Sequence, residues 1–156
     1  MRLRLASLQY DPLLREVEKN IEDVDRHLAS VRSGDVDILV LPEMAFSGYM
    51  FGDREEIEPF LENESGRSIS WAKEKAKVLA CHVLVGFPEK GSNGLAHNSL
   101  AIVGPSGDLQ VKSRAYTVAP LFLLIMPCLD DISETLFIRH RQDLGNAWIP
   151  LRSVPA

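Results

Sequence analysis

The chain has 156 residues, of which 46% are hydrophobic and 25% charged, and its formal net charge is −5. This length and balance suit one globular domain with a core of its own. The acidic balance argues against a nucleic-acid partner, because proteins that bind phosphates present a basic surface.

Cysteine usage and apolar runs indicate the compartment. The two cysteines, Cys81 and Cys128, are too few for a disulfide framework and are typical of a reducing environment. Residues 1–8 have neither the apolar stretch nor the small-residue cleavage site of a signal peptide. The longest apolar run, residues 118–129, contains two prolines and is shorter than the roughly 20 residues that span a bilayer. We therefore expect a soluble, cytoplasmic protein with no membrane partner.

The first predicted elements alternate between strand and helix. Residues 3–9 form a compact apolar run, which indicates a buried strand. Residues 17–31 carry apolar side chains at steps of three and four, which predicts an amphipathic helix followed by Gly34 as a C-terminal glycine. Residues 38–41 form a second apolar run that stops at Pro42. This strand–helix–strand order predicts that the two strands are parallel.

The following elements lead into a hairpin. Residues 53–63 are acidic and fit a short helix or a loop, and Ser68 is expected to cap a helix that runs to Ala80. Further strands are predicted at residues 82–87, 98–103 and 109–112, with turns at residues 92–94 and 105–108. The order β-α-β-α-β-β-β indicates an α/β layered domain.

The pattern changes after Arg114. Residues 115–156 contain one glycine and four prolines, and no regular helical or strand period runs through them. Within this stretch, residues 118–126 fit a buried strand. We therefore divide the chain into a domain at residues 1–114 and an irregular, atypical tail at residues 115–156.

Glu43 is the main candidate functional residue, because it follows directly on the second predicted strand and Pro42. In open α/β sheets, sites gather outside the carboxyl ends of strands. The apolar and aromatic residues that follow are expected to surround the carboxylate and to make it a better proton acceptor at neutral pH. They are Met44, Phe46, Tyr49 and Phe51. From spacing alone, a loop cap or the partner of an arginine is the favoured interpretation of Glu43, ahead of a catalytic base.

Four segments, in order, resemble the nitrilase superfamily of carbon–nitrogen hydrolases. They are LASLQ at residues 5–9, ILVLPEMAFSGY at residues 38–49, LVGFPE at residues 84–89 and HNSLAIV at residues 97–103. The run MAFSGYMF at residues 44–51 looks most like the protein N-terminal amidase branch. The similarity covers residues 3–112.

The resemblance implies an αββα sandwich, of which this chain would hold about the first half. It also implies a Glu-Lys-Cys mechanism that uses no cofactor or metal. In that mechanism a glutamate activates a cysteine thiol, the thiolate attacks a nitrile or amide carbon, and a lysine stabilises the developing negative charge. The implied substrate is a small amide, including the side-chain amide of an N-terminal Asn or Gln, and the implied assembly is a homodimer.

The family's three catalytic positions match this sequence to different degrees. The glutamate matches Glu43. Lys112 is the lysine nearest the family's position, but it comes a few residues early, and it also fits a solvated residue at a strand end. Cys128 stands two residues before an aspartate, as in the family, although Pro127 and the short interval from Lys112 depart from the pattern. Cys128 also fits an inert small hydrophobe, and Cys81 is expected to be a packing residue.

Two functions remain open from the sequence. The chain is either a hydrolase acting on carbon–nitrogen bonds other than peptide bonds, or a truncated, inactive nitrilase-like remnant that at most binds a partner. The four ordered segments argue against an unrelated α/β binding module. Glu89 is expected to support the site indirectly, and the histidines form no metal-binding spacing with a second His, Cys or carboxylate.

Overall fold

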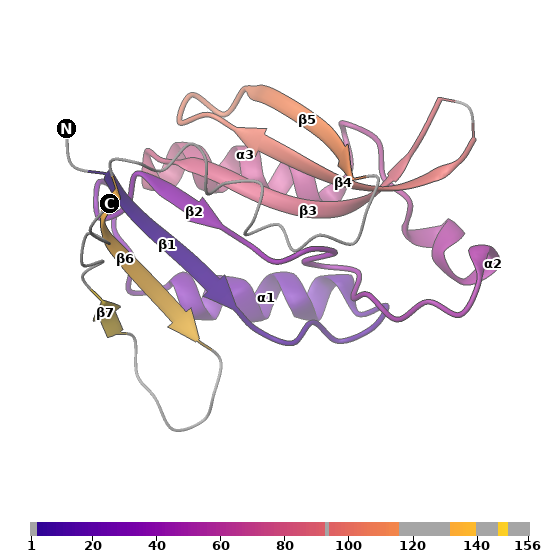
Figure 1. Ribbon diagram of the computed structural model, residues 1–156, viewed down its shortest axis with the longest axis horizontal. Helices are drawn as coiled ribbons and strands as arrows, with labels where there is room; N and C mark the ends of the chain where they lie inside the picture. The colour runs from indigo at the N-terminus through magenta and orange to yellow at the C-terminus, as the bar shows by residue number, and fades with distance from the viewer. Residues whose placement is uncertain (1–2, 93, 116–131, 140–146, 150–156) are drawn as a thin grey trace, which may run out of the picture.

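The computed structural model describes residues 3–92, 94–115, 132–139 and 147–149, with side chains up to residue 110. Within these residues, the strands form one mixed sheet in the order β5-β4-β3-β2-β1-β6-β7 (Figure 1). The strands are β1 (Leu3–Gln9), β2 (Ile38–Val40), β3 (His82–Lys90), β4 (Ala96–Val103), β5 (Leu109–Ala115), β6 (Ile132–Arg139) and β7 (Ala147–Ile149). The helices are α1 (Val17–Leu28), α2 (Arg54–Ile57), the 3-10 helix η1 (Glu58–Phe60) and α3 (Arg67–Leu79). The predicted order of elements through residue 112 is confirmed, with η1 added after α2.

The three central strands β1, β2 and β3 are parallel, as predicted for the first two. Leu5 lies opposite Ile38, and Ile38 lies opposite His82 on the other side. β4 and β5 continue the sheet as antiparallel strands. The carboxyl ends of β1, β2 and β3 therefore meet at one edge of the sheet, where ligand sites form in open α/β sheets.

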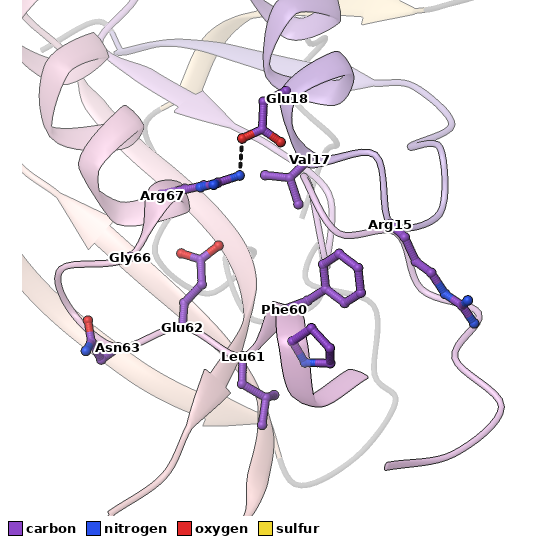
Figure 2. Close-up of a pocket in the computed structure, with 10 residues that line it drawn as sticks. Arg15, Val17, Glu18, Phe60, Leu61, Glu62, Asn63, Gly66 and Arg67 are labelled. Carbon is purple, nitrogen blue, oxygen red and sulfur yellow. Dashed lines mark hydrogen bonds and ion pairs between the residues drawn. The ribbon is translucent and has the colours of Figure 1, made fainter. Parts of the chain in front are cut away.

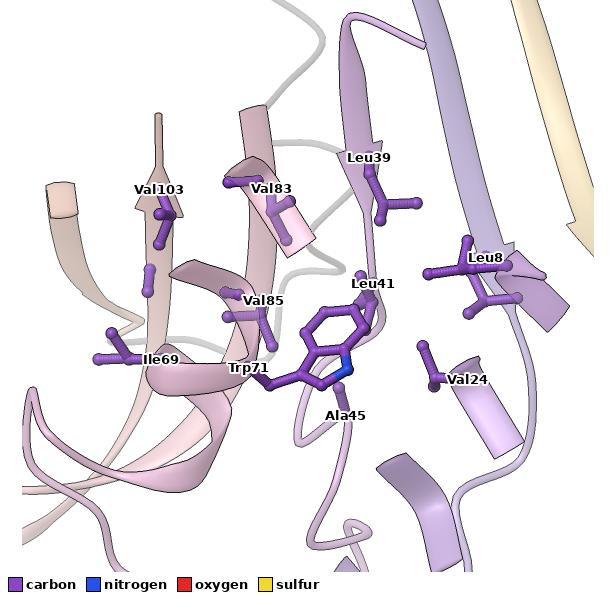
Figure 3. Close-up of a cluster of buried hydrophobic side chains, with 14 of the residues drawn as sticks. Leu8, Val24, Leu39, Leu41, Ala45, Ile69, Trp71, Val83, Val85 and Val103 are labelled. Carbon is purple, nitrogen blue, oxygen red and sulfur yellow. The ribbon is translucent and has the colours of Figure 1, made fainter. Parts of the chain in front are cut away.

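The helices α1 and α3 cover one face of the sheet (Figure 1). Because successive strand residues point to opposite faces, alternate residues of the central strands pack against these helices. Figure 3 shows this core, with Val24 from α1 and Ile69 and Trp71 from α3 beside the strands. Full burial of one such side chain stabilises the fold by about 1.5–3 kcal/mol. A smaller cluster lies on the other face and consists of Leu5, Val40, Leu84 and Leu100.

The first helix ends earlier than predicted. α1 ends at Leu28, and Gly34 belongs to a separate turn, where it has φ 83°. The Gly34 N–H donates to the Leu79 carbonyl at 3.1 Å and so links this turn to the end of α3. The apolar period through Val31 identifies the buried face of the segment, but it does not locate the last helical residue.

The start of the second helix also differs from the prediction. α3 begins at Arg67 after Gly66, so Ser68 is not its cap. Ser68 is buried instead, and its Oγ donates to Glu62 at 2.9 Å. A carboxylate from the preceding loop thus takes the capping role, because the Ser68 N–H also donates to Glu62 at 2.8 Å.

Part of the predicted tail lies in the sheet. β6 runs parallel to β1, with Leu5 opposite Thr135 and Leu8 opposite Ile138, and β7 pairs antiparallel with β6. This differs from the irregular structure that the sequence predicts for residues 115–156. Residues 132–138 are rich in the β-branched and aromatic residues that favour strands, although they lack an apolar–polar alternation. The strand predicted at residues 118–126 lies outside the described residues.

Candidate active site

Glu43 lies at the carboxyl end of a central strand. β2 ends at Val40, and Glu43 begins a turn over residues 43–47. The chain stays bonded to β3 on both sides of Glu43. The Leu41 N–H donates to the Leu84 carbonyl at 2.9 Å, and the Ala45 N–H donates to the Gly86 carbonyl at 3.0 Å. The structure thus places the carboxylate at the sheet edge where the sequence predicts a site.

The backbone around Glu43 is closely packed. A Cβ on Gly86 would lie 2.7 Å from the Glu43 Cα and 2.9 Å from the Pro42 carbonyl oxygen. Met44 has φ 47°, in the left-handed region that non-glycine residues rarely adopt. Such strained residues persist only where the surrounding structure fixes them, and they cluster at functional sites. The absence of a side chain at Gly86 therefore allows β3 to support the turn directly.

The Glu43 carboxylate is half-buried, and within the described residues it makes no hydrogen bond or ion pair. Phe46 packs edge-on against Trp71, with ring centroids 5.0 Å apart, and Phe51 lies 5.6 Å from Phe60. These two rings therefore pack against other aromatic residues, and the predicted aromatic wall around the carboxylate stays a prediction. A partly accessible carboxylate without a fixed partner is open to accept a proton from a group brought to it.

Of the other two predicted catalytic residues, only the backbone of Lys112 lies within the described part of the chain. The backbone of Lys112 lies in β5, opposite Ala101 of β4. Because β4 and β3 separate β5 from β2, this backbone is about 14 Å from β2 at the usual strand spacing. The side chain of Lys112 and the whole of Cys128 lie outside the described part of the chain. Their roles stay predictions.

Cys81 is a packing residue, as the sequence predicts. It is 1% exposed and belongs to the core between the sheet and the helices. Burial, together with the charge of Asp37, raises the pKa of the thiol to about 11. At neutral pH this thiol stays protonated, and only a thiolate is an effective nucleophile. Cys81 is therefore unsuited to covalent catalysis.

Glu89 provides a second carboxylate near the end of β3. It is 2% exposed and accepts a hydrogen bond from Ser99 Oγ at 2.7 Å. Beside it, the Glu62 N–H donates to the Pro88 carbonyl at 2.8 Å, which ties the loop before α3 to the same strand end. These contacts fix Glu89 within β3 and β4, and its expected indirect role at the site stays a prediction.

Titratable side chains elsewhere at the site form no metal centre in the part of the chain that the structure describes. There, no group of three or more His, Cys, Asp or Glu side chains is placed to hold a metal ion. His97 lies opposite Glu89 across β3 and β4, and its buried Nε2 has no hydrogen-bond partner among the described residues.

No helix in the described residues is long and apolar enough to cross a membrane.

A cavity of about 380 Å³ lies beside η1 and the N-termini of α1 and α3 (Figure 2). It is lined by Arg15, Val17, Glu18, Pro59, Phe60, Leu61, Glu62, Asn63, Gly66 and Arg67. The charged lining residues are already paired within the chain: Arg67 with Glu18, Arg15 with Glu56, and Glu62 with Ser68. Burial raises the pKa of Glu62. The two lining arginines therefore already have carboxylate partners, whereas Glu62 is held by hydrogen bonds from Ser68.

Asn20 holds the Glu43 turn and was not identified from the sequence. Its Nδ2 donates to the Phe46 carbonyl at 2.7 Å. Asn20 lies on the buried face of α1 between Val17 and Val24 and is 2% exposed. An amide on the apolar face of a predicted helix is the signal that identifies such a residue, because buried polar groups need hydrogen-bond partners.

Sequence comparison links the chain to a known family. The family model described as carbon-nitrogen hydrolase matches residues 4–127. The protein N-terminal amidase of Schizosaccharomyces pombe is 36% identical over 117 residues, which is 69% of this chain and 40% of that protein. The matched region of the family model includes Glu43 and Lys112.

Solved structures give the same relationship for the fold. A crystal structure of an N-terminal amidase superposes with a TM-score of 0.67 at 27% identity, covering 72% of this chain and 28% of that one. The structure of an N-terminal amidase with a Gln-Val peptide superposes with a TM-score of 0.65 at 26% identity, again covering 72% of this chain and 28% of that one. The chain thus spans less than half the length of these relatives.

Proposed function

The chain belongs to the carbon-nitrogen hydrolase family, and on that premise we propose that Glu43 is the general base of an amidase site. The observation that carries the proposal is the position of Glu43, a half-buried residue at the carboxyl end of β2. On either side of it, the Leu41 and Ala45 N–H groups donate hydrogen bonds to β3. The proposed substrate is the side-chain amide of an N-terminal Asn or Gln. Similarity to the protein N-terminal amidase of S. pombe and to an N-terminal amidase solved with a Gln-Val peptide supports this choice.

The proposed reaction has two halves that share one base. In the first, Glu43 takes the proton of the Cys128 thiol, and the sulfur attacks the amide carbon while Lys112 stabilises the negative charge on the oxygen. The carbon–nitrogen bond then breaks as the nitrogen takes the proton from Glu43 and leaves as ammonia. In the second, a water molecule gives a proton to Glu43 and attacks the thioester carbon. The carbon–sulfur bond breaks, the sulfur regains the proton, and the product is a carboxylic acid.

We expect the purified full chain to release ammonia from a peptide that begins with Asn or Gln. A peptide of the same composition with that residue moved to the second position is the matched control and should release none. Ammonia release and the mass of the peptide product report the reaction. If both peptides give the rate of a blank without protein, the alternative holds, in which the chain keeps the family fold but is catalytically inactive.

A further inference from the structure

We propose that residues 10–20 form a cradle that positions Glu43, with Asn20 as its central positioning residue. This inference rests on the proposed role of Glu43 as a base and adds the means by which its position is set. Residues 10–20 run from the end of β1 through a loop into the first turns of α1. None of the cradle residues used in this proposal needs to touch the substrate.

The carbonyl groups that follow Glu43 are held one after another. Four successive carbonyls, those of residues 44–47, each accept a hydrogen bond. The donors are the Gly48 N–H to Met44 at 3.0 Å, the Tyr10 hydroxyl to Ala45, Asn20 Nδ2 to Phe46 at 2.7 Å, and the Arg15 N–H to Ser47 at 2.8 Å. Three of these four donors belong to the cradle. The orientation of the turn is therefore determined mainly by a segment distant in sequence.

Asn20 connects the loop after β1 to the turn that follows Glu43. Its Oδ1 accepts from the Leu13 N–H at 2.8 Å, and its Nδ2 donates to the Leu13 carbonyl at 2.7 Å as well as to Phe46. These bonds use both N–H groups of the amide and fix the loop that supplies the Arg15 N–H. Because Asn20 is only 2% exposed, water does not readily replace a lost bond.

The cradle and the turn also pack backbone against backbone. A Cβ on Gly48 would lie 2.8 Å from the Leu14 Cα. On the opposite side, the turn is bonded through Ala45 to Gly86 of β3. The turn is thus held between the cradle and β3, which is how the positive φ of Met44 is maintained next to the proposed base. A displacement of about 1 Å at a catalytic group lowers a rate by about 100-fold, so this support matters for catalysis.

Asn20→Asp tests the cradle, because it keeps the side-chain shape and the acceptor but removes both donors. The matched control is Asp37→Asn. It weakens the pairing of Asp37 with Arg4, in which the Arg4 N–H donates at 2.7 Å and the guanidinium at 3.1 Å, at the opposite end of β2. We expect Asn20→Asp to speed amide hydrogen exchange at Ala45 and Gly48 by about 10- to 100-fold, since a buried acceptor is left unpaired. The Gly104 amide, bonded to Asp108 in the distant hairpin, should not change.

Each outcome decides the proposal. Unchanged exchange at Ala45 and Gly48, or an equal rise at Gly104, would overturn it. An equal rise at Ala45 and Gly48 in Asp37→Asn would do the same, because the effect would then be general loss of stability. If Asn20→Asp does not fold, Tyr10→Phe removes only the bond to the Ala45 carbonyl and should speed exchange at the same two amides.

The kinetic readout separates this inference from the proposed function. With an Asn-led peptide, Asn20→Asp should lower kcat with little change in KM, because the base is displaced while the substrate still binds. Asp37→Asn should keep both values. If the unchanged full chain releases no ammonia but Asn20→Asp still speeds exchange at Ala45 and Gly48, the cradle is supported and the proposed amidase activity is not. If Asn20→Asp releases ammonia with the same kcat as the unchanged chain, Asn20 does not position the base.

Discussion

Replacing Glu43 with glutamine is expected to lower the rate of amide hydrolysis by about 10²- to 10⁴-fold, the usual contribution of a positioned base. Glutamine keeps the size and polarity of the side chain but takes no proton from a thiol. Glu43→Asp keeps the carboxylate and withdraws it by one methylene, so it should retain more activity than Glu43→Gln and less than the unchanged chain. The loss should appear in kcat, because the proton transfer occurs in the transition state.

Glu55→Gln is the matched control for this effect. Glu55 is an exposed carboxylate in the first turn of α2, so the substitution changes the same charge away from the turn at residues 43–47. Circular dichroism should be the same for both variants, which separates a chemical effect from loss of fold. A Glu43→Gln protein that hydrolyses the peptide as fast as Glu55→Gln would show that Glu43 is not the base.

Gly86→Ala should lower the free energy of unfolding by about 1–3 kcal/mol, the usual cost of overpacking. Its Cβ would come within 2.7 Å of the Glu43 Cα and 2.9 Å of the Pro42 carbonyl oxygen. Both contacts are with backbone atoms, so β3 or the turn must shift as a whole. The same shift would move Glu43, and we therefore expect activity to fall together with stability. Denaturant unfolding, followed by the peptide assay under folding conditions, measures both.

A second glycine controls for the general effect of the added methyl group. At Gly52, the Cβ would lie 3.4 Å from Glu56 Oε2, an ordinary contact with the far end of a flexible side chain. Gly52→Ala should change stability little, or raise it slightly by restricting the unfolded chain. If Gly86→Ala is as stable as Gly52→Ala, β3 does not support the Glu43 turn as closely as the structure indicates.

Local patterns predict the central part of the fold. The apolar run at residues 3–9 matches β1, and the helical period from Val17 identifies the buried face of α1. The apolar run that stops at Pro42 places Glu43 after β2, because a buried strand needs apolar residues and proline has no N–H to donate to a neighbouring strand. These features depend on neighbouring residues along the chain, and for that reason sequence alone suffices.

Contacts between residues distant in the sequence account for the differences between the predicted and the observed structure. Ser68 has the chemistry of a helix cap, but Glu62 takes that role once the loop before α3 folds against β3. Phe46 follows the proposed base in the sequence, yet its ring packs against Trp71 of α3. Asn20 is part of a helical pattern, and its bond to Phe46 joins residues 26 positions apart. Such partners are determined by tertiary packing, which periodicity does not encode.

The reactivity of the Cys128 thiol tests most directly whether Glu43 serves as a base in this chain. The purified chain is treated at neutral pH with a thiol-directed electrophile, and labelled peptides are mapped over time. Cys81 is an internal reference that should stay unlabelled while the chain is folded, because it is buried and its pKa is raised to about 11. The account predicts rapid labelling of Cys128 that becomes slow in Glu43→Gln. Slow labelling of Cys128, or a rate that is the same with and without the Glu43 carboxylate, would contradict it.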